Sequence, residues 1–337
     1  MLKAWSQLGG IISVSEAVAG YLREWWPRPG LSMPPVHVVH LSAFGCFGHG
    51  PFQDFGPSAL KQLEQCCTPA YTTLANKPMP TGQDTPTKPT EAGTLADKLI
   101  APANKTIPTR HGTQAQLAGA ETAQQQQSQS AQQAGSCTEH RSAQPAPLPV
   151  LGVLKLTPEK GCSIVLALAR HLRGCFNFLV VAGDPKVAEV LSPQPNVSVI
   201  EPQDDIGKVL SRVCLVLAPS LWFESWGMVV TEAMLRGLPC IISNAGGLPE
   251  AGLNVCPVCP VAPIEIPTDS EGTPIWTLRQ YPKQDIGPWV MAIQQATQPN
   301  IFADLSRRCR QAACSFLMQG AQSELPGLLG WLQSLSG

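Results

Sequence analysis

Hydrophobic and polar residues alternate between residues 150 and 260 in a rhythm typical of an α/β domain. Short continuous apolar runs predict buried strands, and between them apolar residues recur every three or four positions, as on one helix face. The expected strands are Val150–Leu156, Phe176–Ala182, Val197–Ile200, Val213–Ala218 and Leu238–Ser243. The expected helices are Lys160–Leu172, Pro185–Leu191, Asp205–Ser211 and Gly227–Arg236.

This alternation predicts one domain over residues 149–337, with a Rossmann-like parallel sheet covered by helices on both faces. Strands that are apolar along their whole length belong in the middle of such a sheet. Three later helix patterns, near Gly287–Thr297, Ile301–Gln319 and Leu325–Ser336, would complete the domain. Sheets of this kind bind ligands in a crevice at the carboxyl ends of their strands.

Residues 1–58 predict a smaller strand-helix-strand unit. Gly10–Ser15 has the pattern of a short buried strand, and Glu16–Trp26 that of a helix with Ser15 as its N-cap. Val36–His40 predicts a second strand. Because two strands and one helix cannot bury their own apolar faces, we expect this unit to dock on another part of the protein.

Residues 59–148 lose all periodicity and are rich in Pro, Thr, Ala and Gln. This segment supplies much of the excess of Pro, 33 residues in the chain, and contributes to the low share of charged residues, 14%. A sequence so poor in large apolar residues cannot offset its ordering entropy, so we expect a disordered insertion. An inert insertion is favoured over one that recruits partners.

Charge and hydropathy exclude several classes of partner. A net charge of −1 provides no field that would attract nucleic acid, and no apolar run reaches the length of a transmembrane segment. Polar residues such as Gln7 and Glu16 interrupt any signal-peptide core near the N-terminus. We therefore expect a soluble, intracellular protein with no nucleic-acid partner.

The twelve cysteines are scattered, and Cys162, Cys175, Cys214 and Cys240 have the pattern of small buried hydrophobic residues. Cys256 and Cys259 have the CxxC spacing of a metal site or a redox pair. Because no second CxxC and no nearby His accompany them, two thiols beside a Pro-rich strand exit are the favoured interpretation.

The segment from Pro219 to Pro239 carries the candidate chemistry. It leaves a buried strand, forms a loop and enters a helix near Gly227, where unpaired backbone NH groups would suit an anion such as a diphosphate. Glu224 lies in the loop and Glu232 in the helix. A carboxylate beside a diphosphate is favourable only if it accepts hydrogen bonds, and sugar and ribose hydroxyls can donate them. Taken singly, Glu224 is better explained as a loop carboxylate that the nearby helix N-terminus favours, and Glu232 as a solvated helix residue.

Taken as a whole, this segment resembles the E-x7-E motif of family-4-type (group 1) retaining glycosyltransferases of the GT-B fold. The resemblance includes the spacing of Glu224 and Glu232, Trp226-Gly-Met228 between them, Gly237-Leu-Pro239 after them, and Ala245-Gly-Gly-Leu-Pro-Glu250 after the next strand. It implies that Glu224 contacts the donor sugar and that Glu232 binds the ribose hydroxyls. The backbone of Gly227 and Met228, and Gly246 and Gly247, would then belong to the donor site.

A second stretch, Lys155-Leu-Thr-Pro-Glu-Lys-Gly161, resembles the family's R-L-x-x-x-K-G element, whose Arg and Lys neutralise the diphosphate. Here Lys155 stands in the Arg position, and Lys160 matches the Lys. Lysine keeps the charge but lacks the planar fork of arginine, so donor binding or leaving-group stabilisation would be weaker.

The resemblance implies metal-independent transfer of a sugar from a nucleotide-diphosphate sugar, which we expect to be a UDP-sugar, with no cofactor. The acceptor is left open as a carbohydrate, a lipid or a small molecule. Lys155, Lys160 and Glu224 are the candidate catalytic residues. No Asp-x-Asp motif accompanies them, and Asp204-Asp205 is better placed to begin the following helix.

Residues 10–48 resemble only the end of the family's N-terminal, acceptor-side domain, and its earlier strands have no counterpart in the chain. We therefore expect either a fragment of a longer glycosyltransferase or a degenerate relative. Two alternatives stay open beside the enzyme: a non-catalytic nucleotide-sugar-binding module, and another GT-B chemistry such as epimerisation of a nucleotide sugar.

Overall fold

The computed structural model describes residues 10–25, 33–40 and 148–334, and these three ranges belong to one compact unit. The expected disordered insertion, residues 59–148, lies almost wholly outside the described residues, as do residues 41–58. Within the described ranges, every helix is too short or too polar to cross a lipid bilayer.

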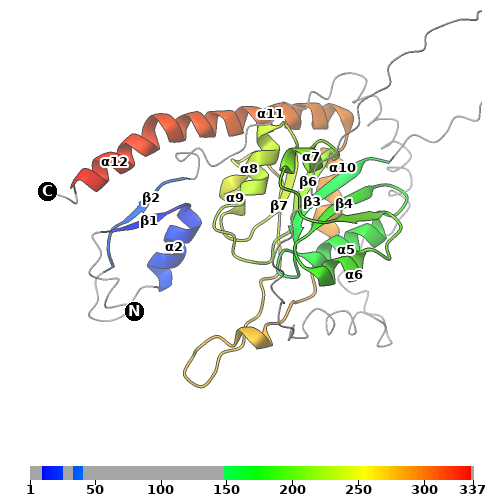
Figure 1. Ribbon diagram of the computed structural model, residues 1–337, viewed down its shortest axis with the longest axis horizontal. Helices are drawn as coiled ribbons and strands as arrows, with labels where there is room; N and C mark the ends of the chain where they lie inside the picture. Colours follow the sequence, from blue (N-terminus) through cyan, green and yellow to red (C-terminus); the bar gives the residue numbers. More distant parts are fainter. Residues whose placement is uncertain (1–9, 26–32, 41–147, 335–337) are drawn as a thin grey trace, which may run out of the picture. The chain divides into compact units, whose positions relative to one another are not determined.

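A six-stranded parallel sheet forms the centre of the larger part of this unit (Figure 1). Its strands lie in the order β5-β4-β3-β6-β7-β8. The chain adds β4 and β5 on one side of β3 and then β6, β7 and β8 on the other side, so the strand order reverses between β3 and β6. Ligands bind at such a reversal in open α/β sheets. The strands are β3 Val150–Leu156, β4 Asn177–Ala182, β5 Val197–Ile200, β6 Leu215–Ala218, β7 Cys240–Ser243 and β8 Val258–Cys259.

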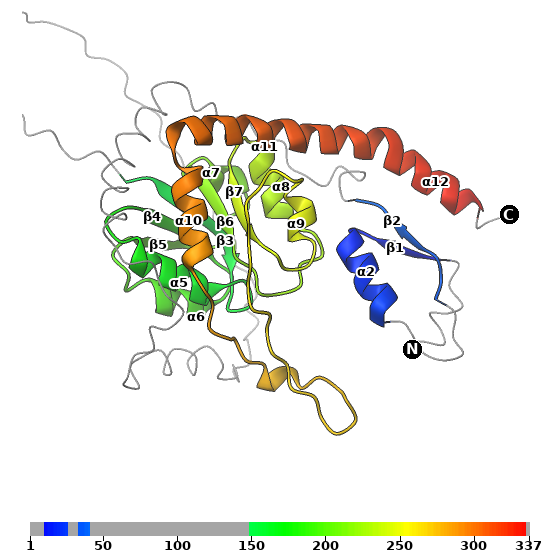
Figure 2. The same ribbon diagram turned by 180° about the vertical axis from the view of Figure 1, so that it is seen from behind.

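Helices lie on both faces of this sheet, as the opposite views in Figures 1 and 2 show. Asp184 and Asp205 start two of them by accepting hydrogen bonds from the backbone NH groups of Lys186 and Gly207. The helices are α5 Cys162–His171, α6 Pro185–Leu191, α7 Ile206–Leu210, α8 Met228–Leu235, α9 Leu248–Ala251, α10 Gly287–Ala296, α11 Pro299–Gln319 and α12 Leu325–Ser334. The α/β class expected from the sequence is confirmed, as is the role of Asp205 at the start of a helix.

Four features were not expected from the sequence. A short helix, α9, follows β7, and a sixth strand, β8, forms from only two residues. The chain then leaves the sheet in a long hairpin, paired through Glu265 and Gln280, that includes a 3₁₀ turn at Trp276–Leu278. Finally, a π-helical turn at Gly320–Glu324 joins α11 and α12 into one continuous helical segment.

The N-terminal residues form the expected strand-helix-strand unit: β1 Ile11–Ser13, α2 Glu16–Trp25 and β2 Val36–Val38. The two strands pair in parallel, and the Ser15 hydroxyl caps α2 by accepting a hydrogen bond from the NH group of Val18. This unit docks through the Glu250 carboxylate at α9, which accepts the NH groups of Glu16 and Ala17 at the start of α2. A carboxylate is favourable there because unpaired NH groups and the positive end of the helix dipole meet it.

His40, just after β2, lies between two carboxylates of the larger part. Its Nε2 is 2.6 Å from Glu250 Oε1, its Nδ1 is 2.8 Å from Glu324 Oε1, and its backbone NH donates to Glu324 Oε2 at 2.9 Å. The pKa of His40 is raised to about 9, mainly by the hydrogen bond to Glu250. Partial burial of the ring lowers the pKa, and Glu324 raises it further. A protonated His40 therefore ties β2 to both α9 and the π-helical turn.

This arrangement predicts that alkaline pH weakens the docking of the N-terminal unit. Because the pKa of His40 is raised from 6.5 to about 9, its stabilisation is complete below about pH 6.5 and is lost as the pH rises through 9. Hydrogen exchange of the amides in β1, α2 and β2 should accelerate, beyond its intrinsic pH dependence, between pH 7 and pH 9.5. His40→Gln should remove this excess, and an equal excess in that variant would contradict the role of His40.

Candidate functional site

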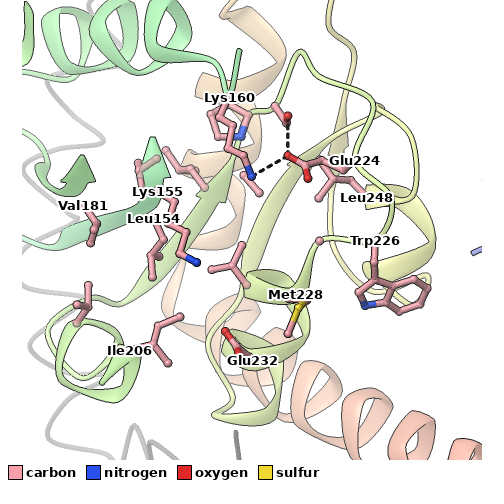
Figure 3. Close-up of a pocket in the computed structure, with 18 of the residues that line it drawn as sticks. Leu154, Lys155, Lys160, Val181, Ile206, Glu224, Trp226, Met228, Glu232 and Leu248 are labelled. Carbon is pink, nitrogen blue, oxygen red and sulfur yellow. Dashed lines mark hydrogen bonds and ion pairs between the residues drawn. The ribbon is translucent and has the colours of Figure 1, made fainter. Parts of the chain in front are cut away.

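A cavity of about 520 Å³ opens at the carboxyl ends of β3 and β6, where the sheet order reverses (Figure 3). Six of the eight site residues expected from the sequence line it. Two lysines, two glutamates and Asp204 give it charge, and apolar side chains from β3, β4 and α7 form another part of its wall. The six are Lys155, Lys160, Glu224, Gly227, Met228 and Glu232.

Lys155 lines the cavity because the backbone of β3 is irregular at that point. The pairing of β3 with β4 shifts register between Val153 and Leu156, and Lys155 has a φ of +49°, in the left-handed region. Non-glycine residues seldom adopt this conformation, and it is found preferentially at functional sites. The irregularity breaks the alternation of side chains that would otherwise continue to the end of the strand.

Lys160 lies in the turn between β3 and α5, directly before Gly161. Gly161 has a φ of +86°, and a Cβ on it would lie 2.0 Å from the carbonyl oxygen of Pro219. Only glycine therefore permits this close contact between the turn after β3 and the loop after β6. The contact places Lys160 beside the loop that carries Glu224.

Glu224 is held by two neighbours on the cavity wall. Its Oε1 is 3.1 Å from Lys160 Nζ and accepts a hydrogen bond from the Ser220 hydroxyl at 2.9 Å (Figure 3). The carbonyl of Ser220 in turn accepts a hydrogen bond from the buried Ser243 hydroxyl of β7 at 2.6 Å. Ser220 lies within the segment from Pro219 to Pro239, but its residue type and position did not indicate a role, so its hydroxyl is the part of the site that sequence reasoning missed.

The Glu232 side chain extends from α8 into the cavity and is more buried than a solvated helix residue would be. Burial raises the pKa of its carboxyl, and the positive charges of Arg236 and Lys155 act in the opposite direction. Arg236 is itself buried and donates to the carbonyl of Glu232 at 2.9 Å. A solvated helix residue, the alternative explanation from the sequence, does not describe this environment.

Gly227 and Met228 place the start of α8 at the cavity. Gly227 has a φ of +117°, and a Cβ on it would lie 2.6 Å from the Leu248 side chain. No side chain caps α8 or α5, whereas aspartates cap α6 and α7. The first NH groups of α8 therefore remain available to a ligand in the cavity.

Gly246 and Gly247 do not line the cavity but support the loop that does. A Cβ on Gly246 would lie 2.3 Å from the carbonyl oxygen of Glu224, and one on Gly247 would lie 2.6 Å from that of Ser225. The NH group of Gly247 also donates to the Glu224 carbonyl at 2.6 Å. These glycines hold the backbone of Glu224 in place, and nothing in the cavity assigns them a direct contact with a donor.

None of the cysteines that the structure describes lines this cavity. Cys256 and Cys259 are buried free thiols, and burial raises the pKa of Cys259 to about 12, so it is a poor metal ligand or nucleophile. Cys162, Cys175 and Cys240 are buried as expected, whereas Cys214 is partly exposed. Among the described residues, no cluster of three or more His, Cys, Asp or Glu could hold a metal ion.

The known sequences that the central part of this chain resembles are glycosyltransferases. Residues 144–252 match the family model described as glycosyl transferases group 1. The amylovoran biosynthesis glycosyltransferase AmsK of Erwinia amylovora is 29% identical over 126 residues, 33% of this chain and 31% of AmsK. D-inositol 3-phosphate glycosyltransferase of Mycobacterium marinum is 32% identical over 111 residues, 29% of this chain and 23% of that protein. The chain thus matches less than a third of the length of either relative.

Solved structures resemble the chain in fold. A glycosyltransferase from Rickettsia africae ESF-5 has a TM-score of 0.51 at 13% identity, covering 99% of this chain and 66% of that one. Sucrose-phosphate synthase from Thermosynechococcus elongatus has the same TM-score at 15% identity, covering 99% and 61%. At these identities the likeness concerns the fold alone. It agrees with the donor-domain half of a GT-B fold.

Proposed function

We propose that this chain, whose residues 144–252 resemble the group 1 glycosyl transferases, binds a nucleotide-diphosphate sugar and serves retaining transfer of that sugar to an acceptor hydroxyl. The observation that carries the proposal is the convergence of two lysines, two glutamates and the uncapped start of α8 in one cavity. Cations and helix NH groups suit a diphosphate, and carboxylates suit the hydroxyls on either side of it.

The order of the side chains fits an extended donor. Lys160 and Glu224 lie together at one end of the cavity, Glu232 lies at another, and Lys155 projects between them (Figure 3). We place the sugar at Glu224, the diphosphate between the two lysines and the start of α8, and the ribose at Glu232. The apolar wall near Val181 and Ile206 is then left for the base.

Glu224 and Lys160 pair with each other in the free site, and a donor would have to separate them. The Lys160 side chain is 40% exposed, so the ion pair is worth at most about 1 kcal/mol. Charge-assisted hydrogen bonds to phosphate and to sugar hydroxyls exceed that value. The pair therefore holds both side chains in position without preventing donor binding.

In the proposed reaction, the bond between the sugar carbon C1 and the diphosphate oxygen breaks, and its electron pair stays on the diphosphate. Lys155, Lys160 and the start of α8 stabilise that developing charge because they are already oriented toward it. The acceptor oxygen then bonds to C1 from the same face. A departing diphosphate oxygen on that face is the nearest base for the acceptor's proton.

Donor binding can be tested by titrating the chain with UDP and UDP-glucose in a calorimeter. We expect Glu232→Ala to weaken both ligands about tenfold or more, because each hydrogen bond to a charged group contributes about 1.5–3 kcal/mol. Glu189→Ala, an exposed carboxylate on α6, is the matched control and should bind like the unaltered chain. Equal affinities for Glu232→Ala and Glu189→Ala would remove the basis for the proposed ribose contact.

A non-catalytic nucleotide-sugar-binding module is the second candidate, and Lys155 in the position of an arginine favours it. Lysine cannot form the bidentate contact that arginine makes with phosphate. Both candidates require donor binding, but only the enzyme cleaves the donor. Slow hydrolysis of UDP-glucose that Lys160→Ala abolishes would favour the enzyme, and binding without hydrolysis would favour the module.

A further inference from the structure

Four exposed aromatic side chains lie in one strip beside the cavity. They are the only exposed aromatic residues among the side chains that the structure describes, with exposed fractions of 40–51%. The rings of Tyr21 and Phe223 are 5.5 Å apart, and those of Trp222 and Trp276 are 5.6 Å apart. Trp222 and Phe223 are consecutive in the loop after β6 and thereby link the two ring pairs, and we call the four residues the aromatic strip: Tyr21, Phe223, Trp222 and Trp276.

The two middle residues of the strip adjoin the cavity wall. Trp222 and Phe223 lie between Ser220 and Glu224 in the loop after β6, and both of those polar residues line the cavity. Tyr21 extends the strip on α2, and Trp276 extends it on the hairpin after β8. Three separate parts of the chain thus bring their exposed aromatic rings to the edge of the same site.

Trp276 is held in the strip by a network outside the cavity. Oε1 of Glu159 accepts hydrogen bonds from the Tyr281 hydroxyl at 2.7 Å and from Nη2 of Arg279 at 3.0 Å. The backbone carbonyl of Glu159 accepts the NH groups of Leu221 and Trp222 at 2.9 and 3.1 Å. Glu159 therefore binds both the hairpin and the loop after β6, which fixes the positions of Trp276 and Trp222 relative to each other.

We propose that this aromatic strip is the acceptor subsite and that the acceptor is a saccharide. The proposal rests on the proposed function, because it assigns the substrate class that receives the donor sugar. One face of a pyranose ring presents several C–H bonds that pack on an aromatic face, while its equatorial hydroxyls remain in water. Neighbouring rings on a surface suit neighbouring sugar units, and Phe223 in the middle of the strip directly precedes Glu224, where the donor sugar is placed.

Charge favours a saccharide over an anionic membrane as the occupant. The hairpin that carries Trp276 exposes Glu265, Asp269 and Glu271, and its Arg279 is paired with Glu159. Acidic groups beside an aromatic strip oppose contact with anionic lipid, whereas a neutral sugar chain is insensitive to them.

The test uses maltopentaose, cellopentaose and chitopentaose as probes, with binding followed by saturation-transfer difference NMR on the whole chain. At least one pentasaccharide should bind, and Trp222→Ala and Trp276→Ala should each weaken it about tenfold or more. Trp276→Tyr should retain much of the affinity, since a tyrosine ring still offers a stacking face. Leu329→Ala, an exposed apolar residue on α12, is the control and should leave binding unchanged.

The affinity for UDP, measured on the same variants, separates this proposal from the proposed function. We expect it to be unchanged, because neither Trp lines the cavity. The absence of binding to all three pentasaccharides would overturn the saccharide assignment, as would equal binding by the Trp→Ala variants. Binding to phosphatidylglycerol vesicles that the same variants abolish would also overturn it, in favour of a membrane. Saccharide binding without any UDP binding would support the strip and overturn the donor site.

Discussion

Lys160→Ala should weaken UDP-glucose binding about 30- to 100-fold, the largest effect we expect for a side chain in the cavity. Loss of charge-assisted hydrogen bonds to a diphosphate costs about 2–3 kcal/mol. The change also leaves Glu224, now without its partner at 3.1 Å, as an uncompensated negative charge beside the ligand. Isothermal titration of the variant with UDP-glucose measures the effect.

Two further variants make this prediction specific. Lys160→Arg keeps the charge and should recover much of the affinity, although the longer side chain has to fit beside Glu224. Lys283→Ala removes an exposed lysine that does not line the cavity and should leave affinity unchanged. If Lys160→Ala and Lys283→Ala bind UDP-glucose equally well, Lys160 does not contact the diphosphate.

Gly246→Ala should destabilise the domain by about 2–4 kcal/mol, as expected for strain combined with a collision in a packed region. Its Cβ would lie 2.3 and 2.6 Å from the backbone oxygen and nitrogen of Glu224, and backbone atoms cannot rotate away as a flexible side chain can. Urea unfolding measures the loss, and UDP-glucose titration of the folded fraction measures any displacement of Glu224.

Gly174→Ala is the matched control for this prediction. Gly174 also has a positive φ, +80°, but a Cβ on it would meet nothing within 4 Å. The stability lost in Gly174→Ala therefore measures the backbone strain alone, about 1 kcal/mol. An equal loss in both variants would show that Gly246 is needed only for its conformation and does not support the Glu224 loop.

The sheet and its helices could be predicted closely because their signal is local. Val150–Leu156 and Pro185–Leu191 have the same bounds in the sequence pattern and in the structure, since apolar runs and an aspartate cap mark them within a few residues. β8 could not be predicted from its sequence. Its two residues form a strand only because β7 offers an edge with which to pair.

Part of the site could also be predicted, because its motif is a local feature of the sequence. The spacing of Glu224 and Glu232 is a property of the sequence, and both residues line the cavity. The support of Glu224 by Ser220 and Gly246 depends on loops that follow different strands and meet only in the folded chain. His40 gave no signal in the sequence, because its partners Glu250 and Glu324 lie 210 and 284 residues away.

The sequence by itself determined the α/β class, the order of the strands from β3 to β7 and the two lysines and two glutamates that carry charge into the cavity. These follow from periodicity and motif spacing, which act over a few consecutive residues. Only the tertiary structure decided that Lys160 pairs with Glu224, that Gly246 and Gly247 support the loop from outside the cavity, and that Tyr21, Trp222, Phe223 and Trp276 form one strip. Such contacts join distant segments, and they exist only once packing of the sheet and helices has brought those segments together.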